Sequence, residues 1–378
     1  MAKVRGHYDP RFREVSSLLE KFVNTEQELG ASILVNVNGQ DVVDIWCGYA
    51  DEGRSRAWHR DTIVNVFSIT KTVLSLAILI LVDRGLLDVD EKVSQYWPEF
   101  AVNGKQDIQV RHVLSHTSGI SGWADVMALE DVYDFDVATA KLAQQHPWWT
   151  PGTASGYHAL SMGHILGVLV RRTTGKTLKE FVAEEIAAPL GADFQIGALE
   201  KDWDRISNIV PPDGPAESMQ LEIGSIMAKT LLNPALGLSV VNSPGWRQAE
   251  LGAANGHGNA RSIGRILSVI SLGGKVDGRC LLSEEAVNLI FQEQSNCLDL
   301  VLGKPLRFGI GYALTGAGRT CYWGGAGGSL VFMDCDRRVT VAYVMNKMNQ
   351  EGPGIRNERA LAYLHAINKA LAAAGPKM

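Results

Sequence analysis

Ser68 and Lys71, within the stretch FSITKTVLSL, have the residue types and the spacing that nucleophilic catalysis requires. At positions i and i+3 of a helix the two side chains lie on one face, so their ends can meet. A neutral lysine amine at that place could take the proton of the serine hydroxyl. The alternative is a helix that begins with a hydroxyl and carries a surface lysine, since about one Ser-x-x-Lys is expected by chance in such a chain.

The residues after Ser68 favour the catalytic interpretation. An apolar run predicts a helix over 69–82, with Lys71 in its first turn. Burial against apolar neighbours and the positive end of the helix both disfavour an ammonium ion, so we expect the pKa of Lys71 to be lowered. The same helix start would direct backbone N–H groups toward Ser68, where they could stabilise an oxyanion.

The two ends of the chain predict an α/β unit that would carry this site. Residues 9–29 have the periodicity of an amphipathic helix that Gly30 ends, and a β-hairpin with Asn38-Gly39 at its turn follows. Toward the C-terminus, four strand-like runs precede a final helix. These runs and the helix span 308–314, 319–323, 328–334, 338–346 and about 355–373.

The intervening residues have a mainly helical pattern. We therefore predict an α/β fold in which an antiparallel β-sheet is flanked by N- and C-terminal helices and carries an inserted, mainly helical domain. Residues 1–67 plus 288–378 would form the discontinuous α/β domain, and residues 68–287 the helical domain. We expect the active site in the cleft between them, because small-molecule sites usually form in such clefts.

Composition excludes several classes of function. The 378 residues are 46% hydrophobic and 20% charged, with a net charge of −5, so nothing basic indicates a nucleic-acid partner. The longest apolar stretch, 76–82, is far shorter than the roughly 20 residues of a membrane span. The first residues lack the pattern of a secretory signal, so we expect a cytoplasmic protein; its oligomeric state stays open.

The cysteines do not predict a metal site or a disulfide framework. They are five in number and scattered, without a Cys-x-x-Cys pair, so free thiols are expected and neither a metal nor a cofactor is predicted. The five are Cys47, Cys280, Cys297, Cys321 and Cys335.

Three segments occur together and in order: FSITKTVLSLAILILVDRGLLDVDEKVSQYWPEF, IQVRHVLSHTSGISGW and WWTPGTASGYHAL. With them the chain resembles the serine β-lactamase and penicillin-binding-protein superfamily over most of its length. More closely, it is similar to the class C β-lactamase-like carboxylesterases of family VIII. The resemblance implies a β-lactamase-like fold and a serine hydrolase that needs no cofactor.

By this resemblance, Ser68 is the nucleophile and Lys71 its base. Tyr157 occupies the first position of the family's Tyr-x-Asn element, whereas Ala159 replaces the asparagine. A phenol there could relay a proton to the leaving oxygen if neighbouring positive charge lowered its pKa from about 10. The alternative is a buried tyrosine with a packing role only.

The family's Lys-Thr-Gly element corresponds to Trp323, Gly324 and Gly325. The two glycines would let a substrate approach the strand, Trp323 would supply an apolar wall, and the N–H of Ala326 would pair with that of Ser68 as the oxyanion hole. A glycine-rich structural hairpin is the alternative. In β-lactamases of this superfamily, an asparagine and a lysine hold the substrate's amide and carboxylate. This chain lacks both residues, so we do not expect efficient β-lactam hydrolysis.

Several other signals receive structural interpretations. His112 and His116 have the spacing of a zinc helix but lack its glutamate. In the stretch 256–266, Asn259 is expected to cap a helix, and His257 to have a surface or capping role rather than a hydrolytic one. Four tryptophans could line the pocket or lie in the core, namely Trp123, Trp148, Trp149 and Trp246.

The sequence thus predicts a serine carboxylesterase that hydrolyses small, short-chain acyl esters through an acyl-enzyme on Ser68, with Lys71 and Tyr157 as proton-transfer groups. A β-lactamase, amidase or acyltransferase of the same superfamily is the nearest alternative. A non-catalytic, penicillin-recognising binding or sensor protein is an alternative of another class. The presence of all three side chains favours the enzyme, because a pure binder does not need them.

Overall fold

A nine-stranded antiparallel sheet is the largest element of the computed structural model, which describes residues 2–213, 221–316, 318–349 and 357–373. Its strands are β1 (Arg5–Tyr8), β2 (Gly30–Val37), β3 (Gln40–Gly48), β10 (Ser295–Leu298), β11 (Pro305–Phe308), β12 (Ala313–Leu314), β13 (Thr320–Gly324), β14 (Leu330–Asp334) and β15 (Val339–Met345). They run in the order β1-β3-β2-β15-β14-β13-β12-β11-β10. Strands from both ends of the chain therefore share one sheet, with β2 paired to β15.

The elements at the chain ends confirm the predicted pattern. β2 and β3 are joined at Asn38 and Gly39, whose φ angles of 54° and 85° are both left-handed, as a two-residue hairpin turn of this kind requires. The predicted N-terminal helix is shorter, with a 3-10 turn η1 (Pro10–Phe12) before α1 (Arg13–Asn24). The predicted final helix is α15 (Glu358–Ala373), which packs against α1.

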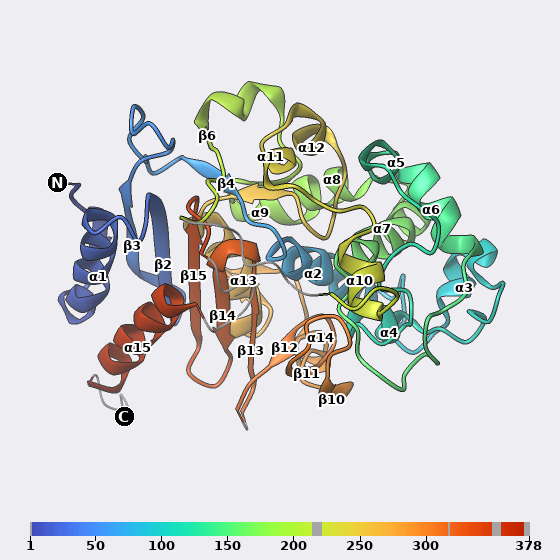
Figure 1. Cartoon of the computed structure of the whole chain (residues 1–378). Helices are drawn as coiled ribbons and strands as arrows, with labels where there is room; N and C mark the ends of the chain where they lie inside the picture. Colours follow the sequence, from blue (N-terminus) through green and yellow to red (C-terminus); the bar gives the residue numbers. More distant parts are fainter. Residues whose placement is uncertain (1, 214–220, 317, 350–356, 374–378) are drawn as a thin grey trace.

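The middle of the chain is mainly helical, as predicted (Figure 1). Its helices are α2 (Thr70–Asp83), α3 (Val93–Tyr96), η2 (Pro98–Phe100), α4 (Val110–Leu114), α5 (Leu129–Tyr133), α6 (Phe135–Gln144), α7 (Ser161–Thr174), α8 (Leu178–Phe181), η3 (Val182–Ala187), α9 (Ala188–Leu190), η4 (Glu200–Arg205), α10 (Ile226–Leu231), α11 (Leu238–Val241), α12 (Pro244–Gln248), α13 (Ala260–Ser271) and α14 (Glu284–Leu289). A 3-10 turn, η5 (Ala326–Gly328), joins β13 to β14.

Two small sheets complete the fold. One has the order β5-β7-β4-β6, and the other is a hairpin of β8 and β9. Their strands are β4 (Ile63–Asn65), β5 (Phe194–Ile196), β6 (Ile206–Ser207), β7 (Gly256–Gly258), β8 (Lys275–Val276) and β9 (Arg279–Cys280). α13 packs on β2 and β15 although it belongs to the predicted helical segment. The division into 1–67 plus 288–378 and 68–287 stays a prediction.

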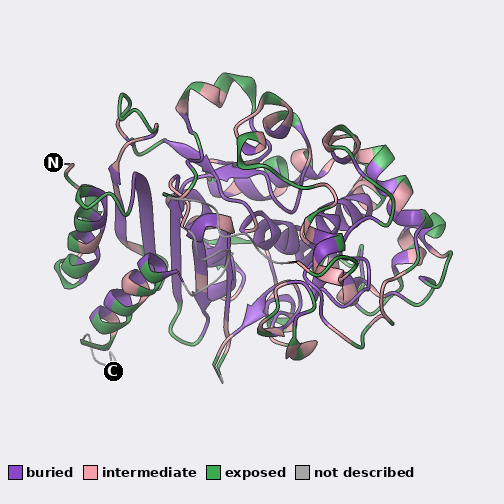
Figure 2. Cartoon of the chain, viewed as in Figure 1, coloured by how far each residue is buried: buried purple, intermediate pink, exposed green. Residues whose placement is uncertain are grey.

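α2 is the central helix of the molecule. Every residue from Thr70 to Leu81 is buried, and Figure 2 shows this helix and the central strands of the large sheet, β2, β15, β14 and β13, as mostly buried. A helix that is apolar on all sides belongs inside a protein, and α2 contacts α7, α13 and α14. No helix in the described ranges is long and apolar enough to cross a membrane. α2 is therefore packed against other helices on several sides.

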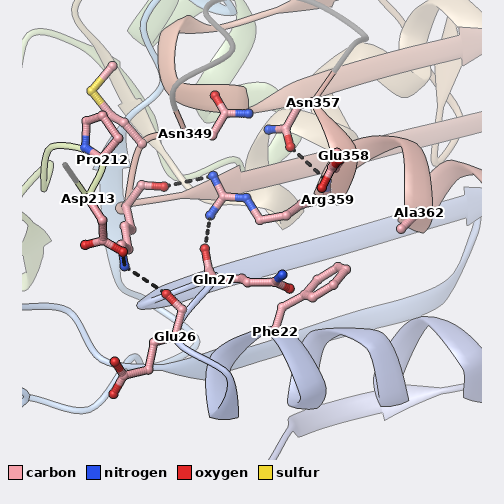
Figure 3. A pocket seen from close by; sticks show the side chains of 12 residues that line it. Phe22, Glu26, Gln27, Pro212, Asp213, Asn349, Asn357, Glu358, Arg359 and Ala362 are labelled. Carbon is pink, nitrogen blue, oxygen red and sulfur yellow. Dashed lines mark hydrogen bonds and ion pairs between the residues drawn. The ribbon is translucent and has the colours of Figure 1, made fainter. Parts of the chain in front are cut away.

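A buried ion pair joins the two ends of the chain. Arg359, at the start of α15, places Nη1 2.7 Å from Glu28 Oε2, and the two side chains are 7% and 0% exposed. The same guanidinium donates to the carbonyls of Gln27 and Lys347 (Figure 3). Tyr343, in β15, donates its hydroxyl to the Glu28 carboxylate. Burial raises the pKa of Glu28, so the charged form depends on these partners.

Replacing Arg359 with alanine is expected to lower the free energy of unfolding by about 3–5 kcal/mol, because Glu28 would keep a buried charge without its partner. Urea denaturation at pH 7 measures this change. The matched control is Lys369→Ala, which breaks the exposed pair with Glu14 and should cost about 0–1 kcal/mol. Similar losses for the two variants would contradict the account.

Candidate active site

Ser68 lies between β4 and α2, directly after a strained residue. Phe67 has a φ of 46°, a left-handed conformation that large side chains rarely adopt and that costs on the order of 1–3 kcal/mol. Hydrogen bonds maintain it: the Phe67 N–H donates to Asn65 Oδ1 at 3.3 Å, and Thr70 Oγ1 donates to the Phe67 carbonyl at 2.5 Å. This bend places Ser68 just before the first turn of α2, as the sequence predicts.

Lys71 is 2% exposed, and its amine has three polar neighbours. Nζ lies 3.4 Å from Ser68 Oγ, 2.9 Å from the carbonyl of Ala159 and 2.8 Å from that of Ala253. Burial lowers the pKa of Lys71 well below its ordinary value, which confirms the predicted direction. A neutral amine has two N–H groups and one lone pair. With both N–H groups on the two carbonyls, the lone pair is left for the Ser68 hydroxyl.

Tyr157 completes the cluster around Ser68. Its hydroxyl donates to Ser68 Oγ at 2.5 Å, and its ring centre lies 4.6 Å from Lys71 Nζ. The condition stated for proton relay by this phenol, a pKa lowered by positive charge, is not met: burial is the largest influence, and it raises the pKa above the usual 10. Because the neighbouring lysine is itself driven toward the neutral form, little charge opposes burial. Tyr157 thus holds its proton at neutral pH.

The two residues predicted to supply the oxyanion donors line one cavity. Ser68 and Ala326, the first residue of η5, both line it, and within the described ranges neither N–H donates a hydrogen bond to another residue. Gly325 is confined by the protein itself, because a Cβ there would lie 2.6 Å from the carbonyl oxygen of Val66. This close approach explains the glycine without a substrate, and contact of Gly324 and Gly325 with a substrate stays a prediction.

Trp323 lies behind Tyr157. The two ring centres are 5.4 Å apart, Trp323 is only 8% exposed, and it is not among the described residues that line the cavity. The ring of His116 packs against the same tyrosine at 5.0 Å. The apolar wall expected from Trp323 is therefore formed by other residues. Trp323 and His116 support the Tyr157 ring, and any contact of Trp323 with a substrate stays a prediction.

The cavity that Ser68, Tyr157 and Ala326 line has a volume of about 450 Å³. Aliphatic side chains of α10, α11, the link between these helices and the segment after β10 form a large part of its wall. They are Met227, Leu231, Leu236, Leu238, Val241, Val301 and Leu302. Of the four candidate tryptophans, only Trp246 lines it; Trp123 is buried and donates to the carbonyl of Ala138. Lys304 is the charged residue among the described ones that line the cavity, and the aliphatic part of the wall suits an uncharged, apolar group.

Two further expectations have clear outcomes. Asn259 caps α13, with its Oδ1 accepting from the Ser262 N–H at 2.9 Å, as predicted. The surface position expected for His257 is wrong: it is 1% exposed in β7, and its Nδ1 lies 2.8 Å from the carbonyl of Asn255. Sequence reasoning missed the two carbonyls at Lys71, because backbone groups carry no signal in residue type.

Comparisons with known proteins find relatives that match nearly the whole chain. The sequence pattern of the β-lactamase family matches residues 15–366. The esterase/β-lactamase LipL of Mycobacterium tuberculosis is 32% identical over 364 residues, which cover 92% of this chain and 83% of LipL. A crystal structure of a family VIII carboxylesterase has 34% identity and a TM-score of 0.91, covering 97% of this chain and 100% of that one. A penicillin-binding-protein homologue from Caulobacter crescentus, with the same coverage, has 31% identity and a TM-score of 0.90.

Proposed function

We propose that this chain, which belongs to the β-lactamase family, hydrolyses small acyl esters through an acyl-enzyme on Ser68. It is a serine hydrolase similar to the family VIII carboxylesterases. One observation carries the proposal. Ser68 Oγ lies within 3.4 Å of the Lys71 amine and 2.5 Å of the Tyr157 hydroxyl, on the wall of an apolar cavity.

Acylation begins with transfer of the Ser68 proton to the lone pair of Lys71. The Ser68 oxygen then attacks the ester carbonyl, and the N–H groups of Ser68 and Ala326 hold the oxyanion. As the tetrahedral intermediate collapses, the departing alkoxide takes the proton of Tyr157. The lysine ammonium then returns a proton to the tyrosine, so that both groups regain their starting state.

Deacylation repeats these steps with water in the place of the alcohol. Lys71, neutral again, removes a proton from the attacking water, and the Ser68 oxygen leaves with a proton from Tyr157. The lowered pKa of Lys71 supports its role as the base, because burial favours the neutral amine. The raised pKa of Tyr157 makes it a weak acid, but an alkoxide is a stronger base than a phenolate and can still take its proton. No step in this cycle needs a cofactor.

The cavity supports a neutral, apolar acyl group. Leucine, valine and methionine side chains dominate its wall, and burial of each methylene of a substrate there contributes about 0.8 kcal/mol. Ala159 stands where the family's β-lactamases have an asparagine for the substrate amide, and its own carbonyl already accepts from Lys71. Esters need less precise positioning than amides because they are intrinsically easier to cleave.

A panel of substrates tests the proposed reaction class. The purified protein is given p-nitrophenyl butyrate, ethyl butyrate, a butyryl amide and the β-lactam nitrocefin, each with and without an added acceptor alcohol. We expect turnover of both esters, with the amide and nitrocefin far slower. Turnover of nitrocefin or of the amide faster than that of the esters would indicate a β-lactamase or an amidase. Transfer of the acyl group to the acceptor alcohol would indicate an acyltransferase. Ser68 labelling without turnover would indicate a binding or sensor protein.

Replacing Tyr157 with phenylalanine should affect esters according to their leaving groups. Ethoxide needs a proton to leave, whereas p-nitrophenolate is a stable anion. We therefore expect kcat/KM for ethyl butyrate to fall about 100-fold, within the range of general acid catalysis, and that for p-nitrophenyl butyrate to fall much less. Steady-state kinetics of both esters measure the ratio. Equal losses would show that Tyr157 is not the acid for the leaving group.

A further inference from the structure

Asp299 is a buried carboxylate that the proposed reaction does not use. It follows β10, is 0% exposed, and accepts four hydrogen bonds. Its Oδ1 accepts from the backbone N–H groups of Tyr157 at 3.1 Å, Val301 at 2.9 Å and Leu302 at 2.8 Å. Its Oδ2 accepts from the Ser155 hydroxyl at 2.6 Å. A buried carboxylate requires such donors, and here they come from two distant parts of the chain.

The four donors divide into a local and a distant pair. Val301 and Leu302 are two and three residues further along the chain, so their bonds form a turn of the kind that aspartate commonly makes. Tyr157 and Ser155 belong to the segment before α7. A backbone bond from the Leu300 N–H to the Ser155 carbonyl, at 2.8 Å, runs beside them. One oxygen atom thus joins the backbone of Tyr157 to two residues of the cavity wall.

We propose that Asp299 is a positioning residue for ester hydrolysis, which holds Tyr157 at Ser68 and fixes the wall at Val301 and Leu302 relative to it. This inference rests on the proposed role of Tyr157. The Tyr157 hydroxyl must stay within hydrogen-bond distance of Ser68 Oγ, and a displacement of about 1 Å at a reacting group can cost about 100-fold in rate. Loss of the Asp299 bond to the Tyr157 backbone permits such a displacement.

Two substitutions separate positioning from local folding. In Asp299→Ser the hydroxyl oxygen can still accept from the N–H groups of Val301 and Leu302, as serine does in turns, but its side chain is too short for Tyr157 and Ser155. In Asp299→Asn the amide oxygen keeps the three backbone bonds, and the amide nitrogen donates to the Ser155 hydroxyl. The asparagine variant therefore removes only the charge.

The test is kcat/KM for ethyl butyrate and p-nitrophenyl butyrate, with the melting temperature of each variant. For Asp299→Ser we expect a loss of about 100-fold on the ethyl ester and a much smaller loss on the p-nitrophenyl ester, as for a misplaced acid. Asp299→Asn should restore both values to within about threefold, since its hydrogen bonds are kept. A serine variant that loses both activities equally, or neither, would overturn the proposal, as would an asparagine variant as poor as serine.

Ser155→Ala is the second variant, in case Asp299→Ser does not fold. It removes one hydrogen bond to Asp299 Oδ2. We expect kcat/KM for ethyl butyrate to fall about fivefold more than kcat/KM for p-nitrophenyl butyrate, which corresponds to the free energy of one hydrogen bond. An unchanged ratio of the two kcat/KM values would then overturn the proposal. Failure of the proposed function is distinguishable from failure of this inference. A wild-type protein that hydrolyses neither ester would contradict both, whereas an active wild type with unaffected variants would contradict only the positioning role of Asp299.

Discussion

Replacement of Ser68 with alanine is expected to lower kcat/KM for p-nitrophenyl butyrate by about 10⁴-fold or more, because the oxyanion donors and the cavity that remain cannot form an acyl-enzyme. The backbone N–H at position 68 and the neighbouring Lys71 and Tyr157 stay in place in this variant. Any loss therefore reports on the hydroxyl alone. Initial rates of p-nitrophenol release measure it.

Ser75→Ala is the matched control for this change. Ser75 lies on the same helix, is buried like its neighbours, and donates its hydroxyl to the carbonyl of Gly311 outside the cavity. We expect its activity to stay near that of the wild type. Retained activity in the Ser68 variant would mean that another serine is the nucleophile.

Replacement of Lys71 with methionine should lower kcat/KM by about 10³-fold, within the range for loss of a general base. Methionine keeps the length and the apolar body of the side chain, so the packing around α2 is largely preserved. Lys105→Met is the control, since Lys105 is also buried and its amine donates to the carbonyls of Val102 and Gln145, away from the cavity. A methionine variant at position 71 with activity within a few-fold of wild type would exclude Lys71 as the base.

The pH dependence of the wild-type protein gives a second test of the role of Lys71. Only the neutral amine can act as a base, so wild-type kcat/KM should rise as pH passes through the lowered pKa of Lys71 and then level off. Between that pKa and the ordinary value of about 10.4, the unfolded state binds a proton that the folded state does not. Folding stability therefore rises with pH across this window.

Lys71→Met removes this linkage. The stability of the variant should rise less steeply with pH than that of the wild type, which must give up a proton from Lys71 in order to fold. Because the carbonyls of Ala159 and Ala253 lose their donor in the variant, the slope with pH, and not the absolute stability, is the readout. Lys105→Met should also make folding stability rise less steeply with pH, since burial lowers the pKa of Lys105 to about 8. This variant should keep its activity. Thermal melts across pH measure both. A Lys71 variant whose stability rises with pH as steeply as that of the wild type would contradict a neutral buried lysine.

Much of the fold could be predicted because local chemistry decides it. Asn38 and Gly39 readily adopt the two left-handed conformations that the hairpin turn needs, and the alternation of apolar residues fixes the strands that follow. The relation of Ser68 to Lys71 was also predictable, since it depends only on helix periodicity. These features need no knowledge of distant parts of the chain.

The remaining features of the site depend on tertiary contacts. The partners of Lys71 are backbone carbonyls, which any residue type supplies, and the raised pKa of Tyr157 comes from burial that only the packed structure determines. Trp323 occupies the position of the lysine in the family's Lys-Thr-Gly element, but it lies behind Tyr157 in space. Asp299 reaches Tyr157 across a long stretch of chain, and no local pattern marks it.

Covalent labelling tests the central claim most directly. The wild-type protein and its Ser68→Ala variant are treated with a p-nitrophenyl alkylphosphonate, and intact mass and peptide mapping locate the adduct. We expect one phosphonyl group per chain on the peptide that contains Ser68, with parallel loss of esterase activity, and no adduct in the variant. An adduct on another residue, accompanied by the same loss of activity, would contradict Ser68 as the nucleophile.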